Sequence, residues 1–309
     1  MNLRKIRTTK RCLAVIFILL AILLCVGCIS PQEDTPPPSS PQPTLSEDDD
    51  KIPITVAVTI PPLRQFVEAV GGDRVSVMVM VPPGASPHTY EPTPGQLRAL
   101  SETDVYVMVG SGIEFENVWM ERIMSMNSDM EVIDTSTGIE PLSEDSTGDG
   151  GTDPHIWTSP ANAVRMVRTI EDGLSRHYPA YADEFSHGAD DYVARLEQLD
   201  AQIRASREGN PTRPLMVYHP AWGYFAHEYD IPLIVIETDG KEPSPTHLQT
   251  MIDRATEEQV TAIVVAPEQT TKNAEVIARE TGAGIIYISS LEEDYLAMMH
   301  RIADVANTP

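Results

Sequence analysis

The sequence predicts an α/β protein with two similar lobes of mostly parallel sheet, joined by one long helix. Three observations lead to this fold class. Short β-branched runs alternate with amphipathic segments of helix length, and this alternation occurs twice. A helical pattern without proline lies between the two halves. Strands that alternate with helices favour βαβ units and a parallel sheet.

Each half contains four strand-like runs. Those of the first half are Ile54–Ile60, Val75–Val81, Val105–Gly110 and Glu131–Asp134. Those of the second half are Leu215–His219, Ile231–Glu237, Ala262–Pro267 and Ile285–Ser289. We therefore expect an N-terminal lobe over residues 52–178, a linking segment over 179–209 and a C-terminal lobe over 210–309.

The linking segment predicts a single helix over residues 182–208. Its apolar residues Tyr192, Leu196, Leu199 and Ile203 recur at spacings of three and four, which is the period of one helix face. Gly188 is the weak point of this pattern. Two lobes joined by such a helix form a stiff clamp, and the cleft between them is where a ligand is expected.

The first 28 residues have the layout of a secretory signal. Five basic residues precede an apolar run from Cys12 to Val26. Gly27 and Cys28 resemble the lipobox of prokaryotic lipoproteins, in which the cysteine is lipidated and becomes the first mature residue. Cys25 stands where a lipobox usually has leucine, so an uncleaved anchor over Cys12–Ile29 is the alternative. Both interpretations tether the rest of the chain to the outer face of the cytoplasmic membrane.

Residues 29–51 are rich in proline, serine and acidic side chains, which predicts a disordered tether. The formal net charge of the chain is −24, which makes nucleic acid an unsuitable partner. All three cysteines lie in the leader. The exported part therefore has no disulfide and depends on its hydrophobic core.

Three of the eight histidines adjoin a proline at a boundary between elements, namely His88, His155 and His219. The first two precede helix starts, marked by Thr93–Pro94 and Ser159–Pro160. His219 closes a strand, so its ring should lie at the carboxyl edge of a sheet, where α/β folds bind ligands. Any one of them alone is more often a structural residue. Together, from both halves, they would form a metal site between the lobes.

Five segments resemble signature segments of the ZnuA/TroA-like family, the zinc- and manganese-binding solute receptors of ABC importers. They are GASPHTYEPTPGQLRAL, DPHIWTSPANA, VYHPAWGYFAHEYDIPLI, GKEPSPTHL and APEQTTKNAEVIARETGAGI. The resemblance covers nearly all of the chain from about Ile52 onward. It implies two (β/α)4 lobes joined by a rigid helix, a metal ion in the interlobe cleft, and delivery of that ion to an ABC permease with its ATPase.

By position, His88, His155 and His219 match the family's three principal ligands. Histidine at the third position is similar to the zinc members, whereas manganese members tend to have glutamate there. The family's fourth ligand is commonly an aspartate after the last strand, where this chain has Ser289. Water, a carboxylate or Ser289 could therefore fill that place. The loop before the DPH segment is acidic and lacks the histidines that zinc members often carry.

Three neutral imidazoles suit tetrahedral Zn²⁺, and Mn²⁺ suits them less because it prefers oxygen ligands. Glu91, Glu237 and Glu268 are candidates to orient the imidazoles. The sequence thus predicts an extracytoplasmic zinc receptor rather than an enzyme. A zinc hydrolase and a metal-free adhesin lipoprotein are the alternatives.

Overall fold

The computed structural model describes residues 52–143, 151–209, 213–237 and 243–308. These residues belong to one compact unit that begins at Lys51. The predicted signal peptide, Cys28 and the tether over 29–51 lie outside the described residues. Within the described ranges, no helix combines the length and the apolar character needed to cross a membrane.

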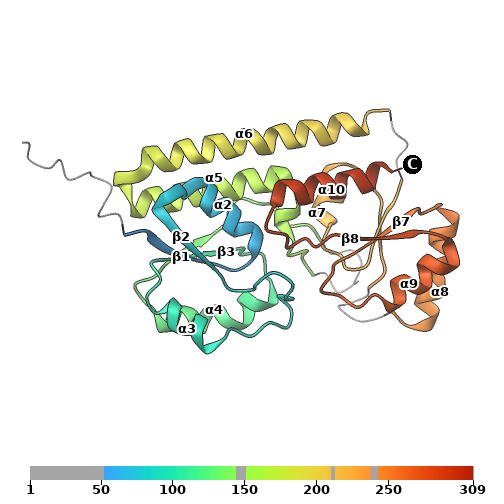
Figure 1. The fold of residues 1–309 in the computed structure, drawn as a ribbon, viewed down its shortest axis with the longest axis horizontal. Helices are drawn as coiled ribbons and strands as arrows, with labels where there is room; N and C mark the ends of the chain where they lie inside the picture. The colour runs from blue at the N-terminus through green and yellow to red at the C-terminus, as the bar shows by residue number, and fades with distance from the viewer. Residues whose placement is uncertain (1–51, 144–150, 210–212, 238–242, 309) are drawn as a thin grey trace, which may run out of the picture. The chain divides into compact units, whose positions relative to one another are not determined.

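The first sheet is parallel and has the strand order β2-β1-β3-β4. Its strands are β1 (Ile54–Val58), β2 (Val75–Val79), β3 (Val105–Met108) and β4 (Glu131–Asp134). Its helices are α2 (Pro61–Gly71), α3 (Pro94–Leu100), α4 (Glu114–Met126) and α5 (Pro160–His177), with short 3₁₀ turns at Gly72–Arg74, Ile156–Thr158 and Pro179–Tyr181. We call this sheet with its helices the N-terminal lobe (Figure 1).

The second sheet repeats this topology, with parallel strands in the order β6-β5-β7-β8. Its strands are β5 (Leu215–Val217), β6 (Leu233–Val235), β7 (Ala262–Val265) and β8 (Gly284–Tyr287). Its helices are α7 (Gly223–Glu228), α8 (Pro245–Glu257), α9 (Lys272–Thr281) and α10 (Tyr295–Asn307). This is the C-terminal lobe, and the predicted fold class of two parallel-sheet lobes is confirmed.

Most strands end earlier than their β-branched runs predict. The first, second and fifth strands stop at Val58, Val79 and Val217 rather than at Ile60, Val81 and His219. Some backbone hydrogen bonds to the neighbouring strand continue past these ends, for example from the Thr59 N–H to the Val107 carbonyl at 3.3 Å and from the Tyr218 N–H to the Val264 carbonyl at 2.8 Å. The run predicted that His219 is the last residue of the strand. In the structure it lies two residues past the end of β5.

The linking helix α6 (Ala182–Arg207) confirms the prediction of one long helix, and it runs along both lobes in Figure 1. It packs on α2 and α5 of the N-terminal lobe and on α10 of the C-terminal lobe. Gly188 has a packing role in it. A Cβ at this position would lie 2.5 Å from the carbonyl oxygen of Ala69 and 2.8 Å from that of Val70. Only glycine lets α6 approach the end of α2 so closely.

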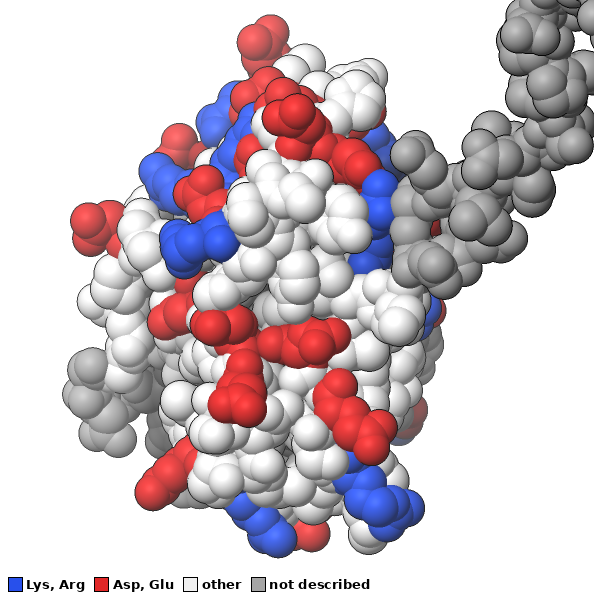
Figure 2. All heavy atoms as spheres, turned by 90° about the vertical axis from the view of Figure 1, so that its left-hand side faces the viewer, with Lys and Arg blue, Asp and Glu red and all other residues white. Residues whose placement is uncertain are grey.

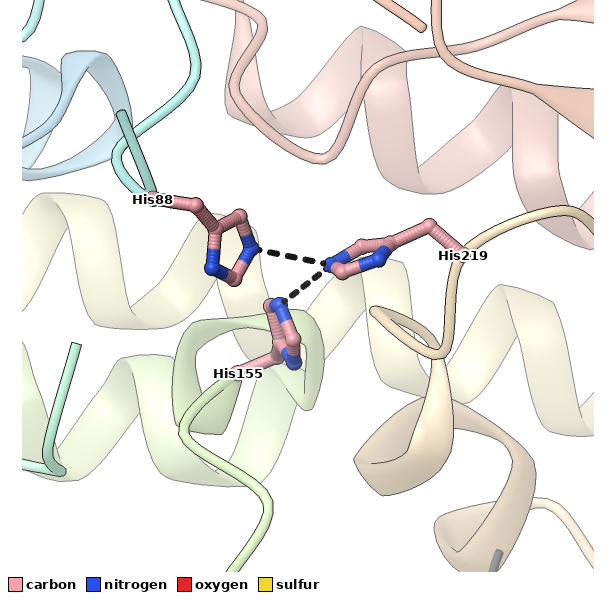
Figure 3. Close-up of side chains that lie close together, drawn as sticks. All are labelled: His88, His155 and His219. Carbon is pink, nitrogen blue, oxygen red and sulfur yellow. Dashed lines mark hydrogen bonds between the residues drawn. The ribbon is translucent and has the colours of Figure 1, made fainter. Parts of the chain in front are cut away.

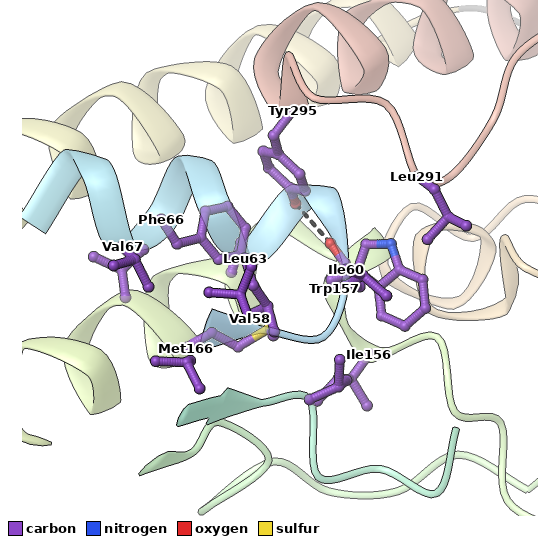
Figure 4. Packing of buried hydrophobic residues seen from close by; sticks show 14 of the residues in the cluster. Val58, Ile60, Leu63, Phe66, Val67, Ile156, Trp157, Met166, Leu291 and Tyr295 are labelled. Atoms are coloured by element: carbon purple, nitrogen blue, oxygen red, sulfur yellow. Dashed lines mark hydrogen bonds between the residues drawn. The ribbon is translucent and has the colours of Figure 1, made fainter. Parts of the chain in front are cut away.

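The main hydrophobic core is continuous across the two lobes (Figure 4). The rings of Phe66 on α2 and Tyr295 on α10 meet edge to face, with centroids 5.0 Å apart. Tyr295 Oη donates to the carbonyl of Trp157 at 2.9 Å, and Trp157 Nε1 donates to the carbonyl of Ser290 at 2.7 Å. These contacts couple the first sheet's helices to the loop that follows the last strand.

A second, smaller core lies on the other face of the C-terminal sheet. Successive side chains of β5 alternate between the two cores, because Leu215 and Val217 belong to the main core and Met216 belongs to the smaller one. The smaller core also contains Ile263 on β7 and is covered by α8 and α9. The two faces of the C-terminal sheet are thus covered by two separate clusters of buried side chains.

Charged side chains of both signs lie on the face of the molecule shown in Figure 2. On the face shown in Figure 2, acidic side chains lie scattered among uncharged ones, with basic side chains beside them toward its upper and lower ends. Some charged side chains form ion pairs, for example Arg168 with Asp190 at 2.6 Å and Arg74 with Glu184 at 2.6 Å. The pair of Arg168 and Asp190 is exposed and contributes little to stability. The Arg74 side chain is only 13% exposed and meets Glu184 through two hydrogen bonds.

Candidate metal centre

The three predicted histidines meet between the lobes (Figure 3). His219 Nε2 lies 3.3 Å from His88 Nε2 and 3.2 Å from His155 Nε2. The ligand atoms of all three lie within 4.8 Å of one another. A tetrahedral zinc ion with nitrogens at about 2.05 Å would place them about 3.3 Å apart. The observed spacing therefore suits three ligands of one small ion.

His88 is held on a tight loop after β2. Ser86 forms the turn, because its carbonyl accepts from the backbone N–H groups of Thr89 and Tyr90 at 3.1 and 3.0 Å. The end of this loop is fixed by Thr93, which caps α3 in a complete capping box with Gln96. The prolines and this cap explain how an imidazole with a 34% exposed side chain keeps a defined position.

His155 is buried and has the most constrained surroundings of the three. Asp153 Oδ1 accepts both the backbone N–H of His155 at 2.9 Å and its ring Nδ1–H at 2.8 Å. The ring lies beside Trp157, with centroids 5.3 Å apart. Ser159 then caps α5 through the backbone N–H of Asn162 at 3.0 Å. Asp153 thus fixes the position of the His155 backbone and the orientation of its ring.

His219 comes from the C-terminal lobe, on the loop between β5 and α7. Its Nδ1–H donates to Glu237 Oε2 at 2.6 Å. The backbone N–H of Ala221 donates to the His219 carbonyl at 2.8 Å, which forms a tight turn. Glu237 follows β6, the strand beside β5. His219 and Glu237 therefore lie on loops that follow neighbouring strands at the same edge of the sheet.

Each histidine has a carboxylate on the nitrogen that faces away from the other two. His88 Nδ1 lies 2.8 Å from Glu114 Oε2, and the other partners are Asp153 and Glu237. A carboxylate on Nδ1 keeps the proton there and leaves the Nε2 lone pair for a metal. Three lone pairs directed at one point repel one another unless a cation lies between them. The donor set therefore favours binding of a cation.

Of the three carboxylates that contact the histidines, only one was predicted from the sequence. Glu237 was predicted, whereas Glu91 is exposed and Glu268 bonds to Ser289 rather than to a histidine. Asp153 was missed, although an Asp two residues before a histidine is a known side-chain turn signal. Glu114 was also missed, and no local pattern pointed to it, because α4 approaches the His88 loop only in the folded chain.

A buried glutamate supports the position of α4 and hence of Glu114. Glu116 Oε1 accepts from the backbone N–H of Val109 at 2.7 Å and from the Thr59 hydroxyl at 2.5 Å, and its Oε2 accepts from the Gly110 N–H at 2.9 Å. Burial raises the pKa of the Glu116 carboxyl, and these three hydrogen bonds oppose that shift. The side chain closes the turn between β3 and α4.

The cavity at the three histidines is small. Its volume is about 40 Å³, while one water molecule needs roughly 10–15 Å³. Trp157, Trp222 and Leu291 supply apolar walls, and Glu268 and Gln269 supply polar ones. The space holds an ion with a few waters and is too small for an organic solute. Of the groups of metal-ligating side chains in the described ranges, this is the one that could hold an ion.

The sequence profile of the ZnuA family, described as zinc-uptake complex component A, periplasmic, matches residues 56–307. The chain belongs to this family. A crystal structure of ZnuA is similar to it with 38% identity and a TM-score of 0.78, covering 82% of this chain and 98% of that one. A zinc-bound ZnuA deletion mutant gives the same identity and TM-score, covering 82% and 97%.

Relatives of the family differ in the metal that they are named for. The manganese-binding lipoprotein MntA of Halalkalibacterium halodurans is 27% identical over 308 residues, which is 96% of this chain and 97% of MntA. The zinc-binding protein AdcA of Streptococcus pyogenes is 24% identical, over 80% of this chain and 54% of AdcA. The chain is thus a metal-binding receptor of ABC importers, and the receptor interpretation is confirmed over the hydrolase.

Proposed function

We propose that the chain captures Zn²⁺ through His88, His155 and His219 and hands it to an ABC import permease. The observation that carries this proposal is the convergence of three Nε2 atoms from both lobes, with 3.2 and 3.3 Å between them. Each ring is oriented by a carboxylate on Nδ1. A site made from both lobes can be completed or broken by a small relative movement, which suits reversible capture and release.

Zinc is preferred over manganese because of the donor set. Three imidazole nitrogens match the ligands of tetrahedral zinc, whereas manganese favours oxygen-rich, higher-coordinate sites. Manganese remains the second candidate, since the relative named MntA spans almost the whole chain. Competition between the two ions for the same protein decides between them, with zinc expected to displace manganese.

The site of action follows from the leader and from the relatives. The predicted signal and Cys28 would place the folded part outside the cytoplasmic membrane, tethered to its outer face. Relatives named as lipoproteins support this location. The partner would be a membrane permease with its ATPase, which would take the ion as the lobes release it.

The test is a zinc titration of the full-length chain and of His219→Ala. Loss of one of three ligands should weaken zinc binding by about 100-fold or more, because losing even an outer partner of a ligand costs about 10- to 100-fold and the remaining two imidazoles form an incomplete site. His300→Ala is the matched control, since His300 is exposed on α10. Zinc affinity in His219→Ala equal to that of the control would contradict the site.

Elemental analysis of natively purified protein tests the adhesin alternative. One equivalent of zinc per chain is expected for the receptor. A metal-free adhesin would contain no stoichiometric metal and would take up none on titration.

A further inference from the structure

Glu268 stands at the same sheet edge as His219. It follows β7, and β7 pairs with β5 in the register that joins Val217 to Val264. The loops after these two neighbouring strands therefore leave the sheet side by side. Glu268 lines the same small cavity as His88, His155 and His219. A carboxylate thus stands in the wall of a cavity whose other ligand groups are three imidazoles.

Ser289 holds this carboxylate. Its hydroxyl donates to Glu268 Oε1 at 2.6 Å and accepts from the backbone N–H of Leu291 at 3.1 Å. Both hydrogen-bonding roles of the hydroxyl are therefore in use. Ser289 is not among the residues that line the cavity, whereas its neighbour Ser290 is. The serine supports Glu268 and does not itself face the ion's position.

Glu268 resembles the three histidines in that one of its two polar side-chain atoms is held by a hydrogen bond. Each imidazole is held by a carboxylate on the atom that faces away from the ion's position. Glu268 is held through Oε1, and for its other oxygen no hydrogen-bond partner is found among the described residues. Ligating carboxylates are commonly fixed in this way. The next residue, Gln269, also lines the cavity, and its buried Oε1 has no hydrogen-bond partner in the described part of the chain.

We propose that Glu268 is the fourth ligand of the bound ion, supplied by β7 and supported by Ser289. This rests on the proposed function. The carboxylate lies outside the group of ligand atoms within 4.8 Å of one another, so binding of the ion requires Glu268 to turn Oε2 toward it while Oε1 stays hydrogen-bonded to Ser289. The result is a tetrahedral set of three nitrogens and one oxygen, with one negative charge next to the divalent ion. Water is the rival occupant of this position.

The experiment compares Glu268→Ala and Glu268→Gln with Glu280→Ala in the full-length chain. Glu280 is exposed on α9, so its removal changes the net charge equally without touching the cavity. Zinc affinity, measured by competition with a fluorescent chelator, should fall about 10- to 100-fold in both Glu268 variants. The visible spectrum of bound Co²⁺ should change in both, because that spectrum reports the donor atoms themselves.

Ser289→Ala supplies the second measurement. It should weaken zinc binding less than Glu268→Ala does, and the double variant should be no weaker than Glu268→Ala alone, because the serine acts through the glutamate. Additive losses would contradict this coupling.

Two results would overturn the proposal. The first is zinc affinity of Glu268→Ala equal to that of Glu280→Ala, and the second is a Co²⁺ spectrum unchanged by either Glu268 substitution, which would assign the fourth position to water. If either result is obtained while His219→Ala abolishes zinc binding, Glu268 is not a ligand but the three-histidine site stands. If His219→Ala also binds normally, the three-histidine site itself fails.

Discussion

The two lobes have the same strand order but are buried differently. In the N-terminal lobe, residues on both faces of the sheet, such as Val56 and Ala57, belong to one core. In the C-terminal lobe, the two faces belong to separate cores. One of these is shared with the N-terminal lobe, and the other lies under α8 and α9. The same strand order therefore gives an N-terminal sheet whose two faces belong to one core and a C-terminal sheet whose two faces belong to different cores. We call the C-terminal lobe the divided lobe.

This difference gives the two lobes different roles at the proposed metal site. His155 and its supports belong to the part of the chain that shares the large core through Trp157 and Tyr295. His219, Glu237 and Glu268 are carried by loops of the divided lobe. We expect the N-terminal lobe to be the fixed half of the site and the C-terminal lobe to supply the movable half.

The largest expected effect comes from deleting one side chain in each core. Phe66→Ala in the shared core and Ile263→Ala in the smaller core should each lower the free energy of unfolding by about 2–5 kcal/mol, because both side chains are fully buried. Amide hydrogen exchange should distinguish them. Phe66→Ala should accelerate exchange in both lobes, and Ile263→Ala mainly in α8, α9 and β7.

Uniform acceleration in both variants would mean that the cores unfold as one unit. In that case the division between the two faces of the second sheet has no energetic meaning, and the comparison between the lobes fails.

A smaller effect is expected at Gly188, where α6 meets α2. Helix propensity alone predicts that Gly188→Ala would stabilise the protein by about 1 kcal/mol. The new Cβ would instead lie 2.5 Å from a backbone oxygen, which no side-chain rotation relieves. We expect a net loss of about 1–2 kcal/mol in chemical denaturation. Ala194→Gly, at an exposed position of the same helix, is the control for propensity, and a stabilised Gly188→Ala would refute the close contact.

The smallest expected effect tests the orienting carboxylates of the two lobes. Glu237→Gln keeps a hydrogen bond to His219 but removes the charge, so zinc affinity should fall about tenfold, the low end for such partners. Asp153→Asn should cost more, because Asp153 Oδ1 accepts from both the backbone and the ring of His155. Zinc titrations of the two variants measure the difference. Equal losses would mean that the second hydrogen bond of Asp153 has no effect on binding.

Much of this arrangement could be predicted from local patterns. Alternating β-branched runs and amphipathic segments indicated the two sheets, and the Thr93 and Ser159 caps placed two helix starts correctly. Strand ends could not be predicted, because a β-branched run does not show where the backbone leaves the ladder. The role of Gly188 was also hidden, since its neighbours lie about 120 residues earlier in the chain.

The sequence by itself determined the class of the fold, because hydrophobic periodicity and helix caps are local features. The proline-flanked motifs, together with the family resemblance, singled out His88, His155 and His219 as the candidate ligands. Only the tertiary structure decided which carboxylates serve them. Glu114 reaches His88, and Ser289 turns its hydroxyl to Glu268, through packing between segments that are distant in sequence. The physical reason is that a hydrogen bond depends on tenths of an ångström and on direction, and those are set by how helices and loops pack rather than by residue order.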